Sequence, residues 1–185
     1  MFFLRKSGSR FDLAVSMVGV RMGDRLLQIG SGDGGLFAAL AGKVGLTGRA
    51  CAIDEDGAVV ARAQRAAAAA GVLAEIVRAP YDRLPFDRGA FDLVVVREVL
   101  PALRPEQRVA CLCETLRVLR PGGRCVAIET APRGGLGALL APKGTDPRYA
   151  AAGGAVTALE AEGFRATRLL TEREGLIFIE GVKPG

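Results

Sequence analysis

The sequence predicts an α/β protein in which helices cover both faces of a mostly parallel sheet. Short runs rich in Val, Ile and Leu alternate with longer segments whose apolar residues recur at helical spacing, the pattern of parallel strands joined by crossover helices. The last two strand-like runs are separated by only a few residues, too few for a parallel crossover, so they are expected to pair as an antiparallel hairpin. The 185 residues, half of them hydrophobic, fit a single domain over residues 1–185.

Seven strands are expected. They cover residues 25–29, 50–53, 74–79, 91–96, 124–129, 166–170 and 176–182. The run 91–96 is nearly all apolar, as expected for a central strand that is buried on both faces. The runs 166–170 and 176–182 form the expected terminal hairpin.

Helical patterns fill the segments between these strands. The expected helices are one containing Leu36, Phe37 and Leu40, then 58–70, 105–119 and 149–162. Glu55 and Asp56 stand before the second of them, where negative charge suits the positive end of the helix dipole, and Gly71 ends it. The segment 120–123, RPGG, breaks the third helix before the fifth strand begins.

The charge balance excludes some classes of partner. The chain has 25 basic and 20 acidic residues, a formal net charge of +5, and its basic residues form no long run, so a nucleic-acid partner is not expected. The N-terminus lacks the apolar core of a signal peptide, and the alanine-rich stretch 66–70 is far shorter than a membrane span. We therefore expect a cytoplasmic protein with no membrane span.

Histidine is absent, and the four cysteines are scattered. They are Cys51, Cys111, Cys113 and Cys125, and no two form a CxxC pair, so no metal site is expected. All four fall in strand-like or helix-like runs and are expected to be small buried residues in a reducing compartment. Without histidine, any proton transfer must use a carboxylate, Tyr, Lys, Cys or water.

A glycine-rich turn follows the first strand. The segment 27–34, LQIGSGDG, runs from an apolar strand into a loop whose missing side chains allow a ligand to approach the backbone. Ligands of doubly wound sheets bind outside the carboxyl ends of the strands, where the next helix presents free N–H groups. Because Gly30, Gly32 and Gly35 also satisfy the dinucleotide pattern GxGxxG, the loop alone leaves the cofactor class open, and a tight turn without a ligand is a further alternative.

Asp54 closes the second strand, about twenty residues beyond the loop. A carboxylate there can accept both hydroxyl hydrogens of an adenosine ribose, although capping of the following helix would also explain it. Together, the loop and Asp54 predict a nucleotide cofactor on a Rossmann-like, doubly wound, seven-stranded sheet that is mostly parallel and ends in an antiparallel β-hairpin.

Three segments resemble the class I S-adenosylmethionine-dependent methyltransferases, in particular the group that includes ubiquinone and menaquinone biosynthesis methyltransferases. The segment 27–34 is similar to the LDIGCGTG loop of that family. The segment 84–94, LPFDRGAFDLV, is similar to its LPFPDGSFDLV, and 116–124, LRVLRPGGR, to its RVLKPGGR turn. With the terminal hairpin the resemblance covers nearly the whole chain, and dinucleotide dehydrogenases do not show the second and third motifs.

The resemblance implies S-adenosyl-L-methionine as the cofactor and assigns its contacts by position. The implied cofactor-binding residues are Gly30, Ser31, Gly32, Asp33, Gly34, Asp54, Glu55, Pro80, Tyr81 and Arg97. The loop would hold the amino-acid moiety, Asp54 the ribose hydroxyls, and Glu55 would border the adenine. Pro80 and Tyr81 replace an Asp and a small residue that are frequent in the family. Because a proline side chain accepts no hydrogen bond, adenine recognition is expected to rely on the Tyr81 backbone and on packing.

Glu98 is the candidate catalytic residue. It follows Arg97 at the end of the fourth strand, where the family places residues that face the methyl donor and acceptor, and it is the only carboxylate expected at that edge. An ion pair with Arg97 and a solvated Arg and Glu at a helix start are the two alternatives for this position. Methyl transfer is an in-line displacement from an activated donor, so a dedicated base is optional.

The segments expected to cover the acceptor are short. They are the N-terminal helix or cap segment 1–22 and an irregular loop at 130–148. The acceptor pocket is therefore expected to be open or to be completed by a second subunit, as in a homodimer, and to take a small, hydrophobic, quinone-like molecule, although a protein side chain could also reach it. No Asn-Pro-Pro-Tyr sequence, typical of many nucleic-acid amino methyltransferases, is present.

The function indicated is therefore methyl transfer from S-adenosylmethionine to an unidentified small molecule. A non-catalytic S-adenosylmethionine-binding protein or degenerate partner subunit is the first alternative, motivated by Pro80 and the short cap. An NAD(P)-dependent oxidoreductase that uses the GxGxxG match is the second.

Overall fold

The computed structural model describes residues 10–131 and 146–185. Its strands are β1 (Arg25–Ile29), β2 (Arg49–Asp54), β3 (Glu75–Arg78), β4 (Phe91–Arg97), β5 (Leu119–Thr130), β6 (Arg165–Arg173) and β7 (Leu176–Val182). Its helices are α1 (Asp12–Val18), α2 (Gly35–Val44), α3 (Gly57–Ala69), α4 (Pro105–Val118), α5 (Pro147–Ala151) and α6 (Gly154–Ala161), with a 3₁₀ turn, η1, at Leu100–Ala102.

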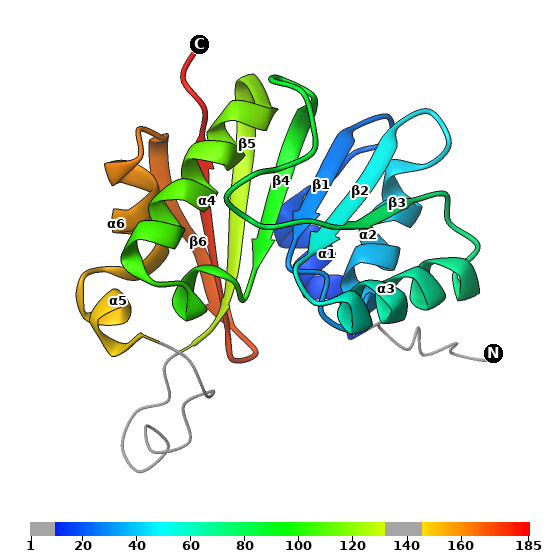
Figure 1. Cartoon of the computed structure of the whole chain (residues 1–185), viewed down its shortest axis with the longest axis horizontal. Coiled ribbons are helices and arrows are strands. Elements are labelled where there is room, and N and C mark those ends of the chain that lie inside the picture. The colour runs from blue at the N-terminus through cyan, green and yellow to red at the C-terminus, as the bar shows by residue number, and fades with distance from the viewer. Residues whose placement is uncertain (1–9, 132–145) are drawn as a thin grey trace, which may run out of the picture.

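The strands form one seven-stranded sheet in the order β3-β2-β1-β4-β5-β7-β6 (Figure 1). β1 to β5 pair in parallel, whereas β7 pairs antiparallel with both β5 and β6. The predicted fold class and the terminal hairpin are therefore confirmed. The hairpin strand that joins the parallel part is the last one, β7, because the chain reaches the sheet edge in β6 before it returns.

Helices cover both faces of the sheet. On one face, α1 and α2 pack against Leu26 of β1 and Val95 of β4, and α3 packs on the same face near the β3 edge. On the other face, α4, α5 and α6 pack against Leu27, Val94 and Cys125. Figure 1 shows α4 in front of the sheet and α1 and α2 behind it. The residues of β4 from Leu93 to Val96 are all buried, as predicted for a central strand.

Two expected boundaries were wrong. The third helix ends at Val118, and the segment 120–123 does not separate helix from strand but belongs to β5, which begins at Leu119. The expected helix 149–162 is two helices, and the first of them begins at Pro147, inside the segment predicted as irregular. Gly153, between the two helices, and Gly154, the first residue of α6, both have positive φ, and this change in backbone direction divides α5 from α6. Most of the expected loop, residues 132–145, lies outside the described residues, as does the start of the cap segment, residues 1–9.

The cysteines largely follow the expectation. Cys51, Cys111 and Cys125 are buried, and burial raises the pKa of the Cys51 and Cys111 thiols to about 12. Cys113 is exposed, contrary to expectation, because it lies on the solvent side of α4, where its thiol contacts Glu162. Within the described residues no helix is long and apolar enough to cross a membrane.

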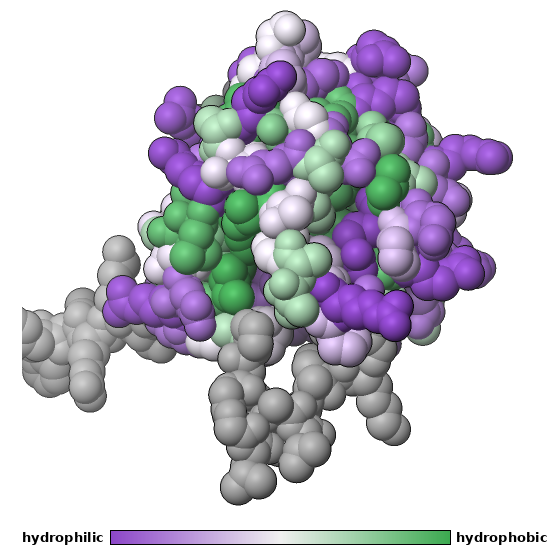
Figure 2. Space-filling model, turned by 90° about the vertical axis from the view of Figure 1, so that its left-hand side faces the viewer, coloured by the Kyte–Doolittle hydropathy of each residue, from purple (hydrophilic) through white to green (hydrophobic). Residues whose placement is uncertain are grey.

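The sheet ends in β6, an edge strand with little burial along its length. Figure 2 views the end of the molecule that carries α5, α6 and β6, and it shows apolar side chains gathered between hydrophilic ones. Leu169 on β6 is 53% exposed. Arg165, Arg168 and Arg173 share the strand with it, and charged side chains on an edge strand oppose pairing with another sheet.

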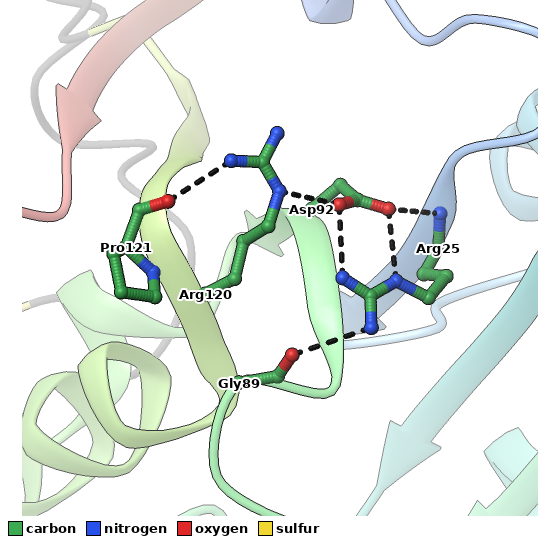
Figure 3. Close-up of polar contacts among 5 residues, drawn as sticks. All are labelled: Arg25, Gly89, Asp92, Arg120 and Pro121. Atoms are coloured by element: carbon green, nitrogen blue, oxygen red, sulfur yellow. Dashed lines mark hydrogen bonds and ion pairs between the residues drawn. The ribbon is translucent and has the colours of Figure 1, made fainter. Parts of the chain in front are cut away.

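Asp92 connects three strands at the amino end of the parallel sheet (Figure 3). Its carboxylate accepts hydrogen bonds from the Arg25 backbone N–H at 2.8 Å, from the Arg25 guanidinium at 3.0 and 3.1 Å, and from Arg120 Nε at 2.6 Å. Arg25 also donates to the Gly89 carbonyl. These donors, Arg25 first, lower the pKa of Asp92 well below its ordinary value. Asp92, the second aspartate of the segment 84–94, therefore stabilises the fold and lies at the opposite end of the sheet from the glycine loop.

Asp92→Asn is expected to lower the free energy of unfolding at pH 7 by about 2 kcal/mol, because one oxygen that binds two arginines is replaced by a donor. A carboxyl whose pKa is lowered in the folded state stabilises it above the unfolded pKa, and this stabilisation is lost as the pH falls. The difference between wild type and variant in urea denaturation should therefore shrink in acid. Glu75→Gln, which breaks the exposed pair with Arg49, is the control and should cost less than about 1 kcal/mol. Equal costs for the two variants would contradict the assignment.

Candidate cofactor site

The carboxyl ends of β1, β2 and β4 meet where the strand order reverses. β1 lies between β2 and β4, so the loop after β1 is bordered by the end of each. Ile29 pairs with Ile53 on one side and Val96 on the other, and the Gly30 N–H donates to the Ile53 carbonyl at 3.0 Å. This reversal is the place where doubly wound sheets bind their ligands.

Three glycines shape the loop. Gly30, Gly32 and Gly34 have φ values of +83°, +57° and +80°, in the left-handed region that side chains disfavour. A Cβ on Gly30 would lie 2.4 Å from the Arg97 carbonyl oxygen, and one on Gly34 would lie 2.5 Å from the Ala63 Cα. The glycines are thus required by backbone conformation and by close contact with β4 and α3.

Asp54 lies at the end of β2 beside this loop and is only 8% exposed. Its Oδ2 atom accepts a hydrogen bond from the Ser31 N–H at 2.9 Å, and its Oδ1 atom accepts one from the Asp56 N–H at 3.2 Å. Asp56, not Asp54, caps α3 by accepting the Ala58 N–H. The alternative interpretation of Asp54 as the helix cap is therefore wrong, because Asp56, two residues further on, performs that function.

The Arg97 guanidinium lies across the glycine loop, opposite Asp33. Its Nη1 atom is 3.7 Å from Asp33 Oδ1 and 3.1 Å from the position that a Cβ on Gly32 would occupy. Nη1 is buried, and no residue in 10–131 or 146–185 accepts a hydrogen bond from it. Asp33 also accepts the Gly35 N–H and pairs with Arg10. Partial burial opposes the ionised form, but these donors and the Arg97 charge outweigh it and lower the pKa of Asp33.

Glu55, Pro80 and Tyr81 form the border beyond Asp54. The Glu55 carboxylate accepts the Tyr81 backbone N–H at 3.1 Å, so the donor expected to serve the adenine is already used within the protein. Burial, and then the nearby Asp54 carboxylate, raise the pKa of the Tyr81 hydroxyl. Pro80 is exposed, and the residue that brings Glu55 and β3 together is Arg78, whose Nε donates to the Glu55 carbonyl.

Of the two alternatives for Glu98, the ion pair with Arg97 is not formed: Arg97 lies near Asp33, and Glu98 is exposed. Its carboxylate accepts the Thr130 hydroxyl at 2.7 Å, and its backbone N–H donates to the Ile128 carbonyl. Its φ of +55° turns its side chain away from Arg97 and toward the end of β5. A non-glycine residue in this region costs about 1–3 kcal/mol and is most often found at functional sites.

A second carboxylate, not predicted from the sequence, lies at the end of β5. Glu129 is 8% exposed, and its Oε1 atom accepts the Tyr149 hydroxyl at 2.6 Å. Burial raises the pKa of Glu129 to about 7, against the opposing effect of the Tyr149 hydrogen bond, while Glu98 raises it and Arg108 lowers it. Arg108 lies over the Tyr149 ring, 4.2 Å from its centre. Glu129 and Tyr149 are 20 positions apart in the sequence, and no spacing signal could have linked them.

A cavity of about 310 Å³ lies between α4 and the α5–α6 pair. Its wall includes Tyr149 and Arg108 together with the apolar side chains of Val109, Leu112 and Ala158. None of the residues lining it belongs to the glycine loop, to Asp54 or to Arg97. The cavity is therefore separate from the loop at the strand-order reversal.

The fold is that of a doubly wound α/β protein. At its strand-order reversal, three features converge: a glycine loop packed closely on β4 and α3, an acidic residue at the end of β2, and a buried guanidinium donor at the end of β4 that has no acceptor among the described residues. Residues 26–123 match the family described as methyltransferase domain. The chain belongs to this family, the class I S-adenosylmethionine-dependent methyltransferases, as the resemblance predicted.

Individual relatives of the chain are also named as methyltransferases. The chain is 32% identical over 126 residues to the ubiquinone/menaquinone biosynthesis C-methyltransferase UbiE of Chromobacterium violaceum, an alignment that covers 68% of the chain and 50% of that protein. The chain thus spans about half the length of this relative. Among solved structures, a SAM-dependent methyltransferase from Aquifex aeolicus has a TM-score of 0.76 at 19% identity and covers 94% of this chain and 89% of its own.

The same fold also occurs with another named activity. The [4+2]-cyclase SpnF has a TM-score of 0.72 at 20% identity, over 94% of this chain and 79% of its own. Likeness at this level concerns the fold, and the reaction depends on the residues of the site.

Proposed function

We propose that this chain binds S-adenosylmethionine along the carboxyl ends of β1, β2 and β4 and transfers its methyl group to a small hydrophobic acceptor. The observation that carries the proposal is the convergence of the glycine loop, Asp54 and Arg97 where the strand order reverses. Gly32 is exposed in the loop, and Arg97 Nη1 is a buried donor without an acceptor among the described residues. These features fit an amino-acid end, and Asp54 fits a ribose.

When bound, S-adenosylmethionine supplies a sulfonium-activated methyl group, so the protein has mainly to bind, orient and exclude water. In the proposal, the loop backbone from Gly30 to Gly34 borders the amino-acid end, and Asp54 accepts hydrogen bonds from the ribose hydroxyls. Glu55, Pro80 and Tyr81 border the adenine, with fewer polar contacts than the sequence predicted because the Tyr81 N–H is used by Glu55.

The acceptor side of the proposal rests on the ends of β4 and β5. Glu98 is exposed at the end of β4, and Glu129 is buried at the end of β5. A buried carboxyl with a pKa of about 7 can take the place of the absent histidine in accepting a proton, so we propose Glu129 as a second candidate base beside Glu98. Relatives named for quinone C-methylation favour a quinone-like acceptor. Completion of the acceptor pocket by a second subunit stays a prediction.

Calorimetry and thermal shift with S-adenosylhomocysteine, NAD⁺ and NADP⁺ test the donor half of the proposal. Only S-adenosylhomocysteine should raise the melting temperature, because a ligand stabilises the state that binds it. Stabilisation by the dinucleotides alone would support the oxidoreductase instead. The acceptor half is tested by transfer of a labelled methyl group to short-chain prenyl hydroquinones.

Asp54→Asn is expected to weaken S-adenosylhomocysteine about 10- to 100-fold, because a charge-assisted hydrogen bond contributes about 1.5–3 kcal/mol. The dissociation constant from calorimetry measures this. Asp56→Asn, at the neighbouring cap of α3, is the control and should bind within a few-fold of wild type. A similar loss in both variants would indicate a general disturbance of the β2 end and not ribose binding.

A non-catalytic S-adenosylmethionine-binding partner subunit is the second candidate. The observation that favours it is the sparse adenine border, where Pro80 has no side-chain acceptor and the Tyr81 N–H is already engaged. Tight binding of S-adenosylhomocysteine without methyl transfer to any acceptor tested would favour this function over catalysis.

A further inference from the structure

Two arginines meet at the Asp33 carboxylate of the glycine loop. They are Arg97 on β4 and Arg10 before α1. Arg10 contacts one oxygen of Asp33, whereas Arg97 remains 3.7 Å from the other, beyond hydrogen-bonding distance. The Asp33 carboxylate thus holds Arg97 near the loop by charge, and Nη1 has no acceptor among the described residues.

The Arg97 donor lies against Gly32 of the loop. Nη1 is buried and lies 3.1 Å from the position of a Cβ on Gly32. The backbone of Arg97 also contacts the loop, since its carbonyl oxygen lies 2.4 Å from the position of a Cβ on Gly30. Arg97 therefore borders the loop through both its main chain and its side chain. An unsatisfied buried guanidinium N–H is costly unless an acceptor is supplied.

A carboxylate is the acceptor that suits a guanidinium best, through short charge-assisted hydrogen bonds. The amino-acid end assigned to this loop under the proposed function carries one carboxylate and one ammonium group. The carboxylate would supply the acceptor that Arg97 Nη1 lacks among the described residues.

We propose that Arg97 is the residue that recognises the carboxylate of S-adenosylmethionine, with Asp33 as a positioning residue that keeps the guanidinium over Gly32 while the site is free. This inference rests on the proposed function and adds that the Arg97 side chain selects the carboxylate of the cofactor. It predicts that the protein discriminates against ligands that keep the adenosine, sulfonium and amino groups but lack the carboxylate.

Decarboxylated S-adenosylmethionine is such a ligand and makes the test independent of any acceptor. Calorimetric dissociation constants for S-adenosylmethionine and its decarboxylated form are measured with wild type, Arg97→Met and Arg97→Lys. Arg168→Met serves as the control, because it removes one positive charge on β6 while Glu180 keeps its pair with Arg124. Thermal unfolding verifies that each variant is folded.

The wild type is expected to prefer S-adenosylmethionine over its decarboxylated form by about 10- to 100-fold. Arg97→Met should reduce this preference to about threefold or less, mainly by weakening S-adenosylmethionine. Arg97→Lys should retain part of the preference, and Arg168→Met all of it.

Three outcomes are decisive against the proposal. An unchanged preference of Arg97→Met for S-adenosylmethionine over its decarboxylated form would show that another group binds the carboxylate. Tighter binding of both ligands by Arg97→Met would show that the guanidinium merely obstructs the loop. If the wild type binds neither ligand, the proposed function fails together with the inference, whereas the first two outcomes leave the proposed function intact.

Discussion

Gly30→Ala is expected to destabilise the protein by more than about 4 kcal/mol and to abolish binding of S-adenosylhomocysteine. Two costs add. An alanine at a φ of +83° is strained by about 1–2 kcal/mol, and its Cβ would lie 2.4 Å from the Arg97 carbonyl oxygen and 2.6 Å from Val99 Cγ2. The carbonyl is backbone of a buried central strand, so it cannot move away without disturbing β4.

Gly71→Ala is the matched control. Gly71 also has a positive φ, +66°, but nothing lies within 4 Å of the position of its Cβ. Its replacement should therefore cost only the conformational part, about 1–2 kcal/mol. Urea denaturation gives both free energies of unfolding, and calorimetry gives ligand binding. Similar losses for the two variants would mean that contact between the loop and β4 is not what requires glycine at position 30.

Glu129→Gln is expected to remove a pH dependence of stability of about 3 kcal/mol. The folded protein holds the Glu129 pKa at about 7, above the ordinary value of 4.5. A carboxyl with a raised folded-state pKa favours folding most below its unfolded pKa, and this contribution is lost as the pH rises toward 7. Across that range, the wild type should lose about 3 kcal/mol relative to Glu129→Gln, which does not titrate but still accepts the Tyr149 hydroxyl.

Two further variants separate Glu129 from its surroundings. Tyr149→Phe removes the donor that favours the ionised form, so the pKa of Glu129 should rise and the loss of stability should extend to higher pH. Glu98→Gln, at the exposed neighbouring carboxylate, should leave most of the pH dependence in place. Denaturation curves at a series of pH values measure all three variants. Parallel stability profiles for wild type and Glu129→Gln would contradict the raised pKa.

The order of elements could be read from the sequence because periodicity is local. The run 25–29 and the run 176–182 were placed at their observed bounds, since each is a short apolar strand next to turn residues. The boundary at Leu119 could not be placed, because the Pro and Gly residues that follow it are typical of a turn and enter the strand only through pairing with β4 and the chain end. The break at Gly153 was missed because two adjacent glycines do not by themselves reveal a positive φ.

For the site, the sequence by itself determined the glycine loop, Asp54 and their place at the carboxyl edge, because a strand that runs into glycines and an acidic strand end are short-range patterns. Only the tertiary structure decided the partners of the charged groups. Arg97 lies near Asp33 and not Glu98, and Glu129 meets Tyr149, because these contacts depend on which strand ends become neighbours when the strand order reverses and on the direction in which each side chain leaves its strand.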